Sequence, residues 1–164
     1  GDNRGGKMKP TNETVAYLAG FFDGEGCIGL YRGLTRHRKD GYSNPQYQLR
    51  IIAVNAKREP LDLFQICFGG AVSKKPKHTP DHLRDRYQWY TSGANALRCL
   101  HKMFPHLLVK RGQAEIAFDY EKTVLPQGLG YRNLTPRTLK YREELRRKFH
   151  ELNVKGGRMN YETY

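Results

Sequence analysis

The chain lacks several features that mark common classes of protein. Its three cysteines are odd in number and widely spaced, which argues against a disulfide framework or a zinc ribbon. Its six histidines include no close ligand pair such as HxH or HExxH, so a zinc hydrolase is not indicated. No segment approaches the roughly 20 apolar residues that span a bilayer, and no signal-peptide pattern is present. These absences predict an intracellular, soluble protein that has no membrane partner and is not secreted.

Acidic residues are scarce relative to basic ones. The chain has 29 Lys plus Arg against 16 Asp plus Glu, a formal net charge of +13 and a pI near 9.8. Such an excess favours a polyanionic partner, with nucleic acid ahead of a membrane surface because no amphipathic basic helix dominates. A merely soluble basic protein is the alternative that composition leaves open. At 164 residues the chain is long enough for one compact domain and too short for two of ordinary size.

An apolar helix near the start of the chain runs directly into acidic residues separated by glycines. One helical stripe consists of Val15, Leu18, Ala19 and Phe22, and a second consists of Tyr17, Gly20, Phe21 and Gly24. A helix in a small soluble domain normally buries one face, so the second stripe predicts contact with another protein surface. Small residues such as Ala19 and Gly20 allow two helices to approach closely. Thr11 or Asn12 is suited to cap the start of this helix.

Asp23 and Glu25 lie at the opposite end of the same predicted helix. Carboxylates there oppose the helix dipole, so helix stability gives no reason for their presence. One interpretation is a metal-binding carboxylate, and the other is a polar turn after a core helix. The residues alone do not decide between the two.

Two segments resemble the same known family. Residues 18–26 read LAGFFDGEG, which resembles the signature of the LAGLIDADG homing endonucleases. The second match is to the family's P-x-L-x-x-K-x-x-Q-A pattern, and it consists of Pro105, Leu107, Lys110, Gln113 and Ala114. The resemblance implies an intron-encoded, site-specific DNA endonuclease (a phosphodiester hydrolase) from a prokaryotic cytoplasm or an organelle matrix. It also implies double-strand breaks that leave 5′ phosphates and short 3′ overhangs.

The rest of the chain alternates between strand-like and helix-like patterns. Strands are predicted at 27–36, 45–55, 71–77 and 84–91, and helices at 59–68, 94–103, 105–123 and 134–152. This order predicts an α+β fold, the αββαββα core of the family, with a curved four-stranded antiparallel DNA-binding sheet and helices on its back. We expect a core at 13–125, a loop and C-terminal helical extension at 126–155, and flexible tails at 1–12 and 156–164. The basic C-terminal helix either clamps flanking DNA or packs on the core.

One face of the predicted sheet is suited to double-stranded DNA. A curved sheet can lie in the major groove, where arginine pairs with guanine and glutamine with adenine. Simple solvated strand faces are the alternative. Ile52 and Val54 interrupt the polar pattern near the end of its strand. The predicted DNA-binding residues are Tyr31, Arg36, Arg38, Lys39, Gln46, Gln48, Arg50, Ser73, Lys75, Lys77, Arg84, Arg86 and Gln88.

A chain with a single copy of the motif implies a homodimer and a pseudo-palindromic target in this family. The predicted dimer interface is Tyr17, Gly20, Phe21 and Gly24. Pairing of the two motif helices would bring both Glu25 carboxylates together, and divalent cations would be needed to make this cluster tolerable. Hard oxygen ligands and phosphate favour Mg²⁺, and Mn²⁺ or Ca²⁺ can occupy the same kind of site.

The resemblance also assigns roles within the predicted site. Glu25 is the essential metal ligand, assisted by the carbonyl of Gly24, although the family name has Asp at the position of Glu25. Lys110 stabilises charge at the scissile phosphate or tunes the nucleophilic water, and Asn55 positions water. Asp23 is expected to cap backbone groups instead of binding metal.

Three points stay open at this level. The gene could lie in an intron or an intein, although the short chain favours an intron. Either Lys57 or Arg58 supplies a further basic group to the site. The same fold also serves as an RNA-splicing maturase, whose partner is intron RNA, or as a DNA-binding regulator that does not cleave. Because both Glu25 and Lys110 are present, cleavage is the preferred hypothesis.

Overall fold

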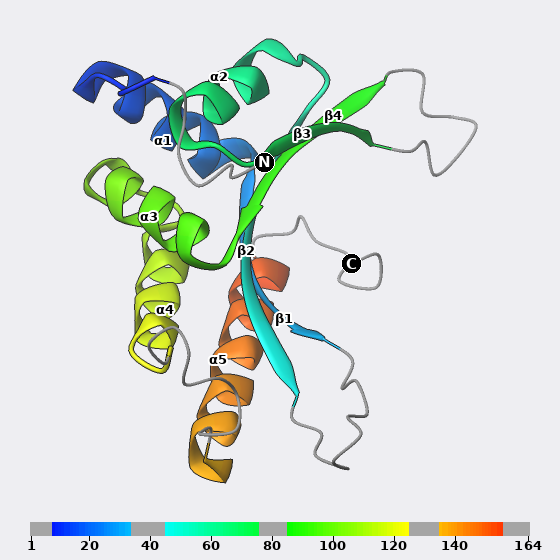
Figure 1. The fold of residues 1–164 in the computed structure, drawn as a ribbon, viewed down its shortest axis with the longest axis vertical. Coiled ribbons are helices and arrows are strands. Elements are labelled where there is room, and N and C mark those ends of the chain that lie inside the picture. Colours follow the sequence, from blue (N-terminus) through cyan, green and yellow to red (C-terminus); the bar gives the residue numbers. More distant parts are fainter. Residues whose placement is uncertain (1–7, 34–44, 76–84, 125–134, 156–164) are drawn as a thin grey trace.

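The computed structural model describes residues 8–33, 45–75, 85–124 and 135–155 (Figure 1). The elements follow one another as α1 (Asn12–Glu25), β1 (Gly26–Gly33), β2 (Gln46–Asn55), α2 (Glu59–Phe68), β3 (Ala71–Lys75), β4 (Arg86–Ser92), α3 (Gly93–Met103), η1 (Phe104–His106), α4 (Arg111–Glu121) and α5 (Pro136–Lys155). Within these ranges no helix has the length and apolar character needed to cross a membrane. The predicted α+β class and its four-stranded sheet are therefore confirmed.

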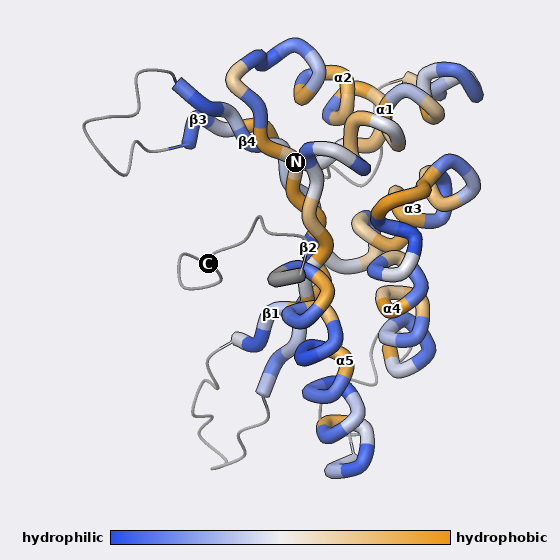
Figure 2. Tube along the Cα trace, turned by 180° about the vertical axis from the view of Figure 1, so that it is seen from behind, coloured by the Kyte–Doolittle hydropathy of each residue, from blue (hydrophilic) through white to orange (hydrophobic). Residues whose placement is uncertain are grey.

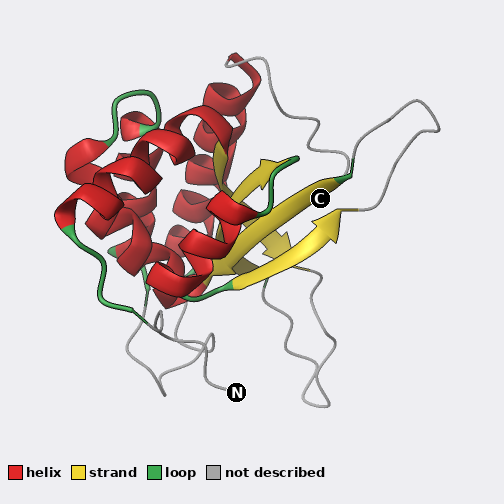
Figure 3. Cartoon of the chain, turned by 90° about the horizontal axis from the view of Figure 1, so that it is seen from above, coloured by secondary structure: helices red, strands yellow, loops and turns green. Residues whose placement is uncertain are grey.

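The sheet is antiparallel throughout, with strand order β1-β2-β4-β3. Figure 3 shows the helices gathered on one side of it. Strand alternation directs Leu49, Ile51 and Ala53 of β2 toward that side, and all three are fully buried. The even-numbered residues of β2 therefore face the opposite side, which the described helices leave uncovered.

Aromatic side chains from three elements form the centre of the core. The Phe64 ring of α2 stacks on Trp89 of β4 with a centroid distance of 4.5 Å, and Phe22 of α1 meets Phe64 edge-on at 6.5 Å. The indole Nε1 of Trp89 donates a hydrogen bond of 2.9 Å to the Gly69 carbonyl. In Figure 2 the middle of β2 is hydrophobic, as expected for a strand that crosses this core. The core thereby fixes the end of α1 against the middle of the sheet.

The two ends of α1 are set by local chemistry. At the start, the Thr11 side chain accepts a hydrogen bond of 3.2 Å from the Thr14 amide, so of the two predicted caps Thr11 is the one used. At the other end, a Cβ atom on Gly26 would overlap the ring of Phe22. Only glycine fits at position 26, where the backbone lies against the Phe22 ring. This close packing allows β1 to begin directly after the last residue of α1.

The C-terminal helix α5 packs on the core. Leu145 and Phe149 are buried, and the helix lies against α4 and the edge strand β1. Asn153 donates a hydrogen bond of 3.1 Å to the Ile28 carbonyl, which satisfies a backbone group of that edge strand. The buried Arg142 donates to the Thr123 side chain at 2.9 Å and to the Thr123 carbonyl at 2.7 Å. Arg142 therefore supports the packing interpretation and is unavailable to clamp DNA.

One predicted helix is wrong in part. The single helix expected at 105–123 is instead the short η1 followed by α4, and residues 107–110 form an irregular link between them. Lys110 is the residue preceding α4, with φ −97° and ψ 13°, and does not lie on a helix face.

Candidate active site and nucleic-acid interface

Asp23 joins the end of α1 to the link before α4. Its carboxylate Oδ2 accepts a hydrogen bond of 2.8 Å from the Leu108 amide, and Oδ1 accepts one of 3.0 Å from the Lys110 amide. The backbone carbonyl of Asp23 accepts a third, of 2.8 Å, from the Lys110 ammonium. Asp23 therefore satisfies backbone groups, as expected from the sequence, although these groups belong to a distant segment and not to its own helix.

The same contacts bring Lys110 to the motif. The charge of Lys110 also acts on Cys27, the second residue of β1. Burial raises the pKa of the Cys27 thiol to about 12, and the positive charge of Lys110 partly opposes this rise. Lys110 thus lies where α1 ends and β1 begins.

Glu25 is the last residue of α1, and its side chain is exposed. Nothing within the described ranges hydrogen bonds to its carboxylate or forms an ion pair with it. The same ranges contain no group of three His, Cys, Asp or Glu residues that could hold a metal ion. The exposed Glu25 carboxylate is a hard oxygen donor of the kind that divalent cations such as Mg²⁺ prefer.

Asn55, Lys57 and Arg58 lie where β2 leads into α2. The Asn55 side-chain oxygen accepts a hydrogen bond of 2.8 Å from the Lys57 amide, so Asn55 shapes this turn. The Arg58 guanidinium pairs with Asp62 at 3.2 Å and lies over the Tyr87 ring at 5.8 Å. Arg58 is therefore engaged with α2 and β4. The described contacts bring none of these three residues to Glu25.

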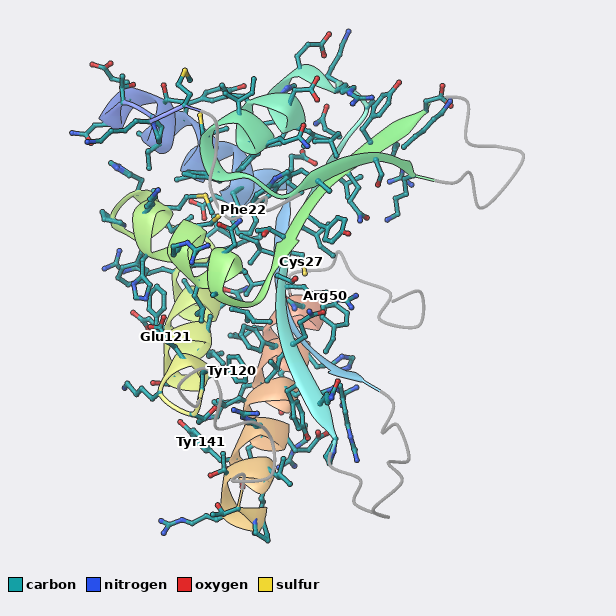
Figure 4. The ribbon with its side chains drawn as sticks, viewed as in Figure 1. Phe22, Cys27, Arg50, Tyr120, Glu121 and Tyr141 are labelled. Atoms are coloured by element: carbon teal, nitrogen blue, oxygen red, sulfur yellow. The ribbon has the colours of Figure 1, made fainter. Side chains whose placement is uncertain are left out.

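The predicted DNA-binding residues share the helix-free face of the sheet wherever the structure describes them. The register pairs Tyr31 with Gln48, Ser73 with Gln88 and Lys75 with Arg86. Directly paired residues project from the same face, so these side chains join Arg50 and Gln46 there. Figure 4 shows Arg50 and Cys27 on the side of the sheet away from α3 and α4. The predicted contacts Arg36, Arg38, Lys39, Lys77 and Arg84 lie outside the described residues.

The outward stripe of α1 has no cover within the described chain. Tyr17 is 52% exposed, Phe21 is half-buried, and a Cβ atom on Gly20 would have nothing within 4 Å. Ala19, by contrast, is fully buried in the core. Of the two small residues expected to permit a close helix approach, only Gly20 is placed to do so.

Leu108 and Val109 extend this apolar surface, although the sequence pattern did not indicate them. They are 85% and 70% exposed, the two most exposed large hydrophobic side chains of the described residues. The hydrogen bond from the Leu108 amide to Asp23 fixes them beside the end of α1. The two adjacent apolar residues directly before Lys110 could have indicated an exposed apolar surface. The helix predicted over 105–123 instead accounted for them as part of an ordinary helical pattern.

Comparisons with known proteins were made on sequence and on structure. No protein-family model and no curated protein matches the chain. Among solved structures, the homing endonuclease I-CvuI in complex with its target is 24% identical, with a TM-score of 0.66, over 86% of this chain and 82% of that one. The homing endonuclease I-TnaI is 22% identical, with a TM-score of 0.60, over 90% and 96%. The LAGLIDADG homing endonuclease I-SmaMI, bound to cleaved DNA, is 16% identical, with a TM-score of 0.60, over 80% and 42%.

This chain has the LAGLIDADG homing-endonuclease fold. In it, the motif occupies α1, and the segment matched to the second family pattern contains η1, the link and the start of α4. The sequence resemblance therefore joins two segments that the fold places in contact through Asp23 and Lys110.

Proposed function

We propose that this protein is an intron-encoded homing endonuclease that cuts both strands of a long DNA site. The observation that carries the proposal is the attachment of Lys110 to the end of α1. Asp23 accepts two hydrogen bonds from Lys110 and one from the Leu108 amide, and the Glu25 carboxylate, two residues after Asp23, is exposed. A carboxylate and an ammonium group thus lie close together in the fold, where α1 leads into the sheet. This is the arrangement that phosphodiester hydrolysis needs.

Double-stranded DNA is the proposed substrate. The helix-free face of the sheet carries arginine, lysine and glutamine, the side chains that read base edges in the major groove. The net charge of +13 supports attraction to phosphate, which makes binding strongly salt-dependent. I-CvuI and I-SmaMI, which have the same fold, are each described in complex with DNA.

We propose that the active species is a homodimer that recognises a pseudo-palindromic site. Tyr17, Gly20, Phe21 and Gly24 form the centre of the interface, with Leu108 and Val109 beside them. A twofold axis at this surface would place one Glu25 near each strand. The match to I-SmaMI supports a paired unit, because it covers only 42% of that chain and leaves room for a second such unit.

Glu25 and the carbonyl of Gly24 are the proposed ligands of Mg²⁺. The exposed carboxylate fits a hard cation, and the I-CvuI structures were obtained with Ca or Mg. When bound, the cation supplies activation of water and stabilisation of the leaving 3′ oxygen. Lys110 then stabilises negative charge on the phosphate, and Asn55 is proposed to orient water. The proposed products carry 5′ phosphates and short 3′ overhangs.

The test compares two charge-matched variants on a target selected from a random DNA library. Glu25→Gln should retain DNA binding and lose Mg²⁺-dependent cleavage. Glu115→Gln, an exposed carboxylate on α4, is the control and should cleave like the wild type. Full cleavage by Glu25→Gln would refute the proposal. Light scattering with and without DNA tests the dimer, which a stable monomer under both conditions would exclude.

A further inference from the structure

Three side chains on the helix-free face of the sheet are already assembled into one unit. The Arg50 Nε group donates a hydrogen bond of 2.8 Å to Gln48 Oε1. The Arg50 guanidinium carbon also lies 4.9 Å from the centroid of the Tyr31 ring. We call Tyr31, Gln48 and Arg50 the arginine platform.

The pleat of two strands creates this platform. Gln48 and Arg50 are two residues apart on β2 and therefore share a face, and they pair across the ladder with Tyr31 and Gly29 of β1. Gly29 has no side chain, and a Cβ atom there would lie 3.1 Å from the Tyr31 ring. The ring therefore leans over Gly29, into the space beside Arg50. A larger residue at 29 would displace the Tyr31 ring, which would then no longer contact the Arg50 guanidinium.

The platform determines which part of Arg50 can reach a ligand. Gln48 engages Nε, so the two terminal amino groups are the pair of donors left to act together. Two such donors match the O6 and N7 acceptors that guanine presents in the major groove. The ring and Gln48 restrict the guanidinium in advance, so less conformational freedom is lost when a base is bound.

We propose that Arg50 reads a guanine in each half-site, with Tyr31 and Gln48 as positioning residues. The inference rests on the proposed function and names one base of its substrate. It also assigns different roles to two predicted DNA contacts, because the Gln48 oxygen is engaged with Arg50.

The register also locates the base. Arg50 pairs with Gly29, three residues beyond Gly26, where the motif ends. At about 3.3 Å per residue this is roughly 10 Å along the strand. Since base pairs rise by about 3.4 Å, the guanine should lie about three base pairs from the cleaved phosphate.

The experiment measures cleavage of a library in which each half-site position is randomised. The wild type should prefer guanine at one position near the expected distance, by about 5- to 150-fold, the range of a bidentate arginine–guanine contact. Arg50→Lys keeps the charge but lacks the fork, so preference at that position alone should fall to less than about 3-fold. Tyr31→Leu and Gln48→Ala should each reduce the preference partially. Arg98→Lys, on α3, is the matched control and should leave the profile unchanged.

Other outcomes overturn the inference. If Arg50→Lys slows cleavage of all sequences equally, Arg50 contacts phosphate and does not read a base. If Arg50→Lys leaves the guanine preference intact, another residue reads that base. Either result leaves the endonuclease proposal standing, whereas a wild-type protein that cuts no DNA would refute the endonuclease proposal itself. Because Arg50 and Gln48 are exposed, circular dichroism should show that both variants fold.

Discussion

Replacing Asp23 by alanine should lower the free energy of unfolding, whereas changing Glu25 to glutamine should not. Asp23→Ala removes the acceptors of the Leu108 and Lys110 amides, at 2.8 and 3.0 Å. A hydrogen bond to a charged group contributes about 1.5–3 kcal/mol. Because these groups are only partly buried, the lower end applies to each, and we expect a loss of about 3 kcal/mol. Asp23→Asn keeps one acceptor and should lose about half as much.

Glu25→Gln is the matched comparison. Glu25 has no partner among the described side chains, and its charge lies at the C-terminal end of α1, where it opposes the helix dipole. Its removal should therefore leave stability unchanged or raise it by about 0.3–1 kcal/mol. Urea unfolding at pH 7, followed by circular dichroism, measures both effects. A loss below about 0.5 kcal/mol for Asp23→Ala, within the usual range of surface substitutions, would refute the reasoning.

The same variant should also affect cleavage. Asp23 holds the Lys110 backbone, so the loss of its carboxylate should let Lys110 move away from the position at which we propose that it acts on phosphate. Removing one preorganised charge-stabilising group commonly lowers turnover by about 10²–10³-fold, and Asp23→Ala should approach this loss. DNA binding should change far less, because the sheet face is untouched. Single-turnover cleavage and gel-shift assays separate the two effects.

Three further predictions concern the core. Trp89→Phe removes the hydrogen bond to the Gly69 carbonyl and part of a fully buried ring, and should cost about 2–3 kcal/mol in urea unfolding. Arg142→Ala leaves the Thr123 carbonyl without its donor and should cost about 2 kcal/mol in the same assay. Burial raises the pKa of Cys99 from 9.0 to about 12, so the stability contributed by its neutral thiol is full below pH 9 and is lost as the pH rises to 12. Over that range, the wild type should lose about 1.4 kcal/mol per pH unit more than Cys99→Ala.

Elements with a strong local pattern were predictable from the sequence. The helix expected at 59–68 matches α2 at both ends, because proline suits its first turn and Gly69 adopts a φ of +74° at its end. The alternation in β2 likewise places Leu49, Ile51 and Ala53 on the buried face, although Ile52 on the other face is buried as well. Polar side chains at 46, 48 and 50 face away from the helices for the same reason.

The link at 107–110 is a segment whose structure local sequence patterns do not predict. Pro105 and the apolar residues after it have the spacing of a helix start, and intrinsic preference alone would continue that helix. Instead, the amides of Leu108 and Lys110 donate to Asp23, which is 85 and 87 residues away in sequence. A prediction made from the residues around 105–123 therefore cannot include Asp23. Because the bonds to Asp23 interrupt the helix and hold Leu108 and Val109 exposed, the local sequence predicted neither the interruption nor the apolar surface.

The different roles of Asp23 and Glu25 follow from the spacing between them. Successive residues of an α-helix are rotated by about 100°, so positions 23 and 25 lie about 200° apart around the axis of α1. Such residues do not face each other, and a segment that packs against one leaves the other turned away. Asp23 is the acid that binds the amides of the link at 107–110, whereas Glu25 is exposed. One acid therefore anchors Lys110, while the other remains available to a ligand.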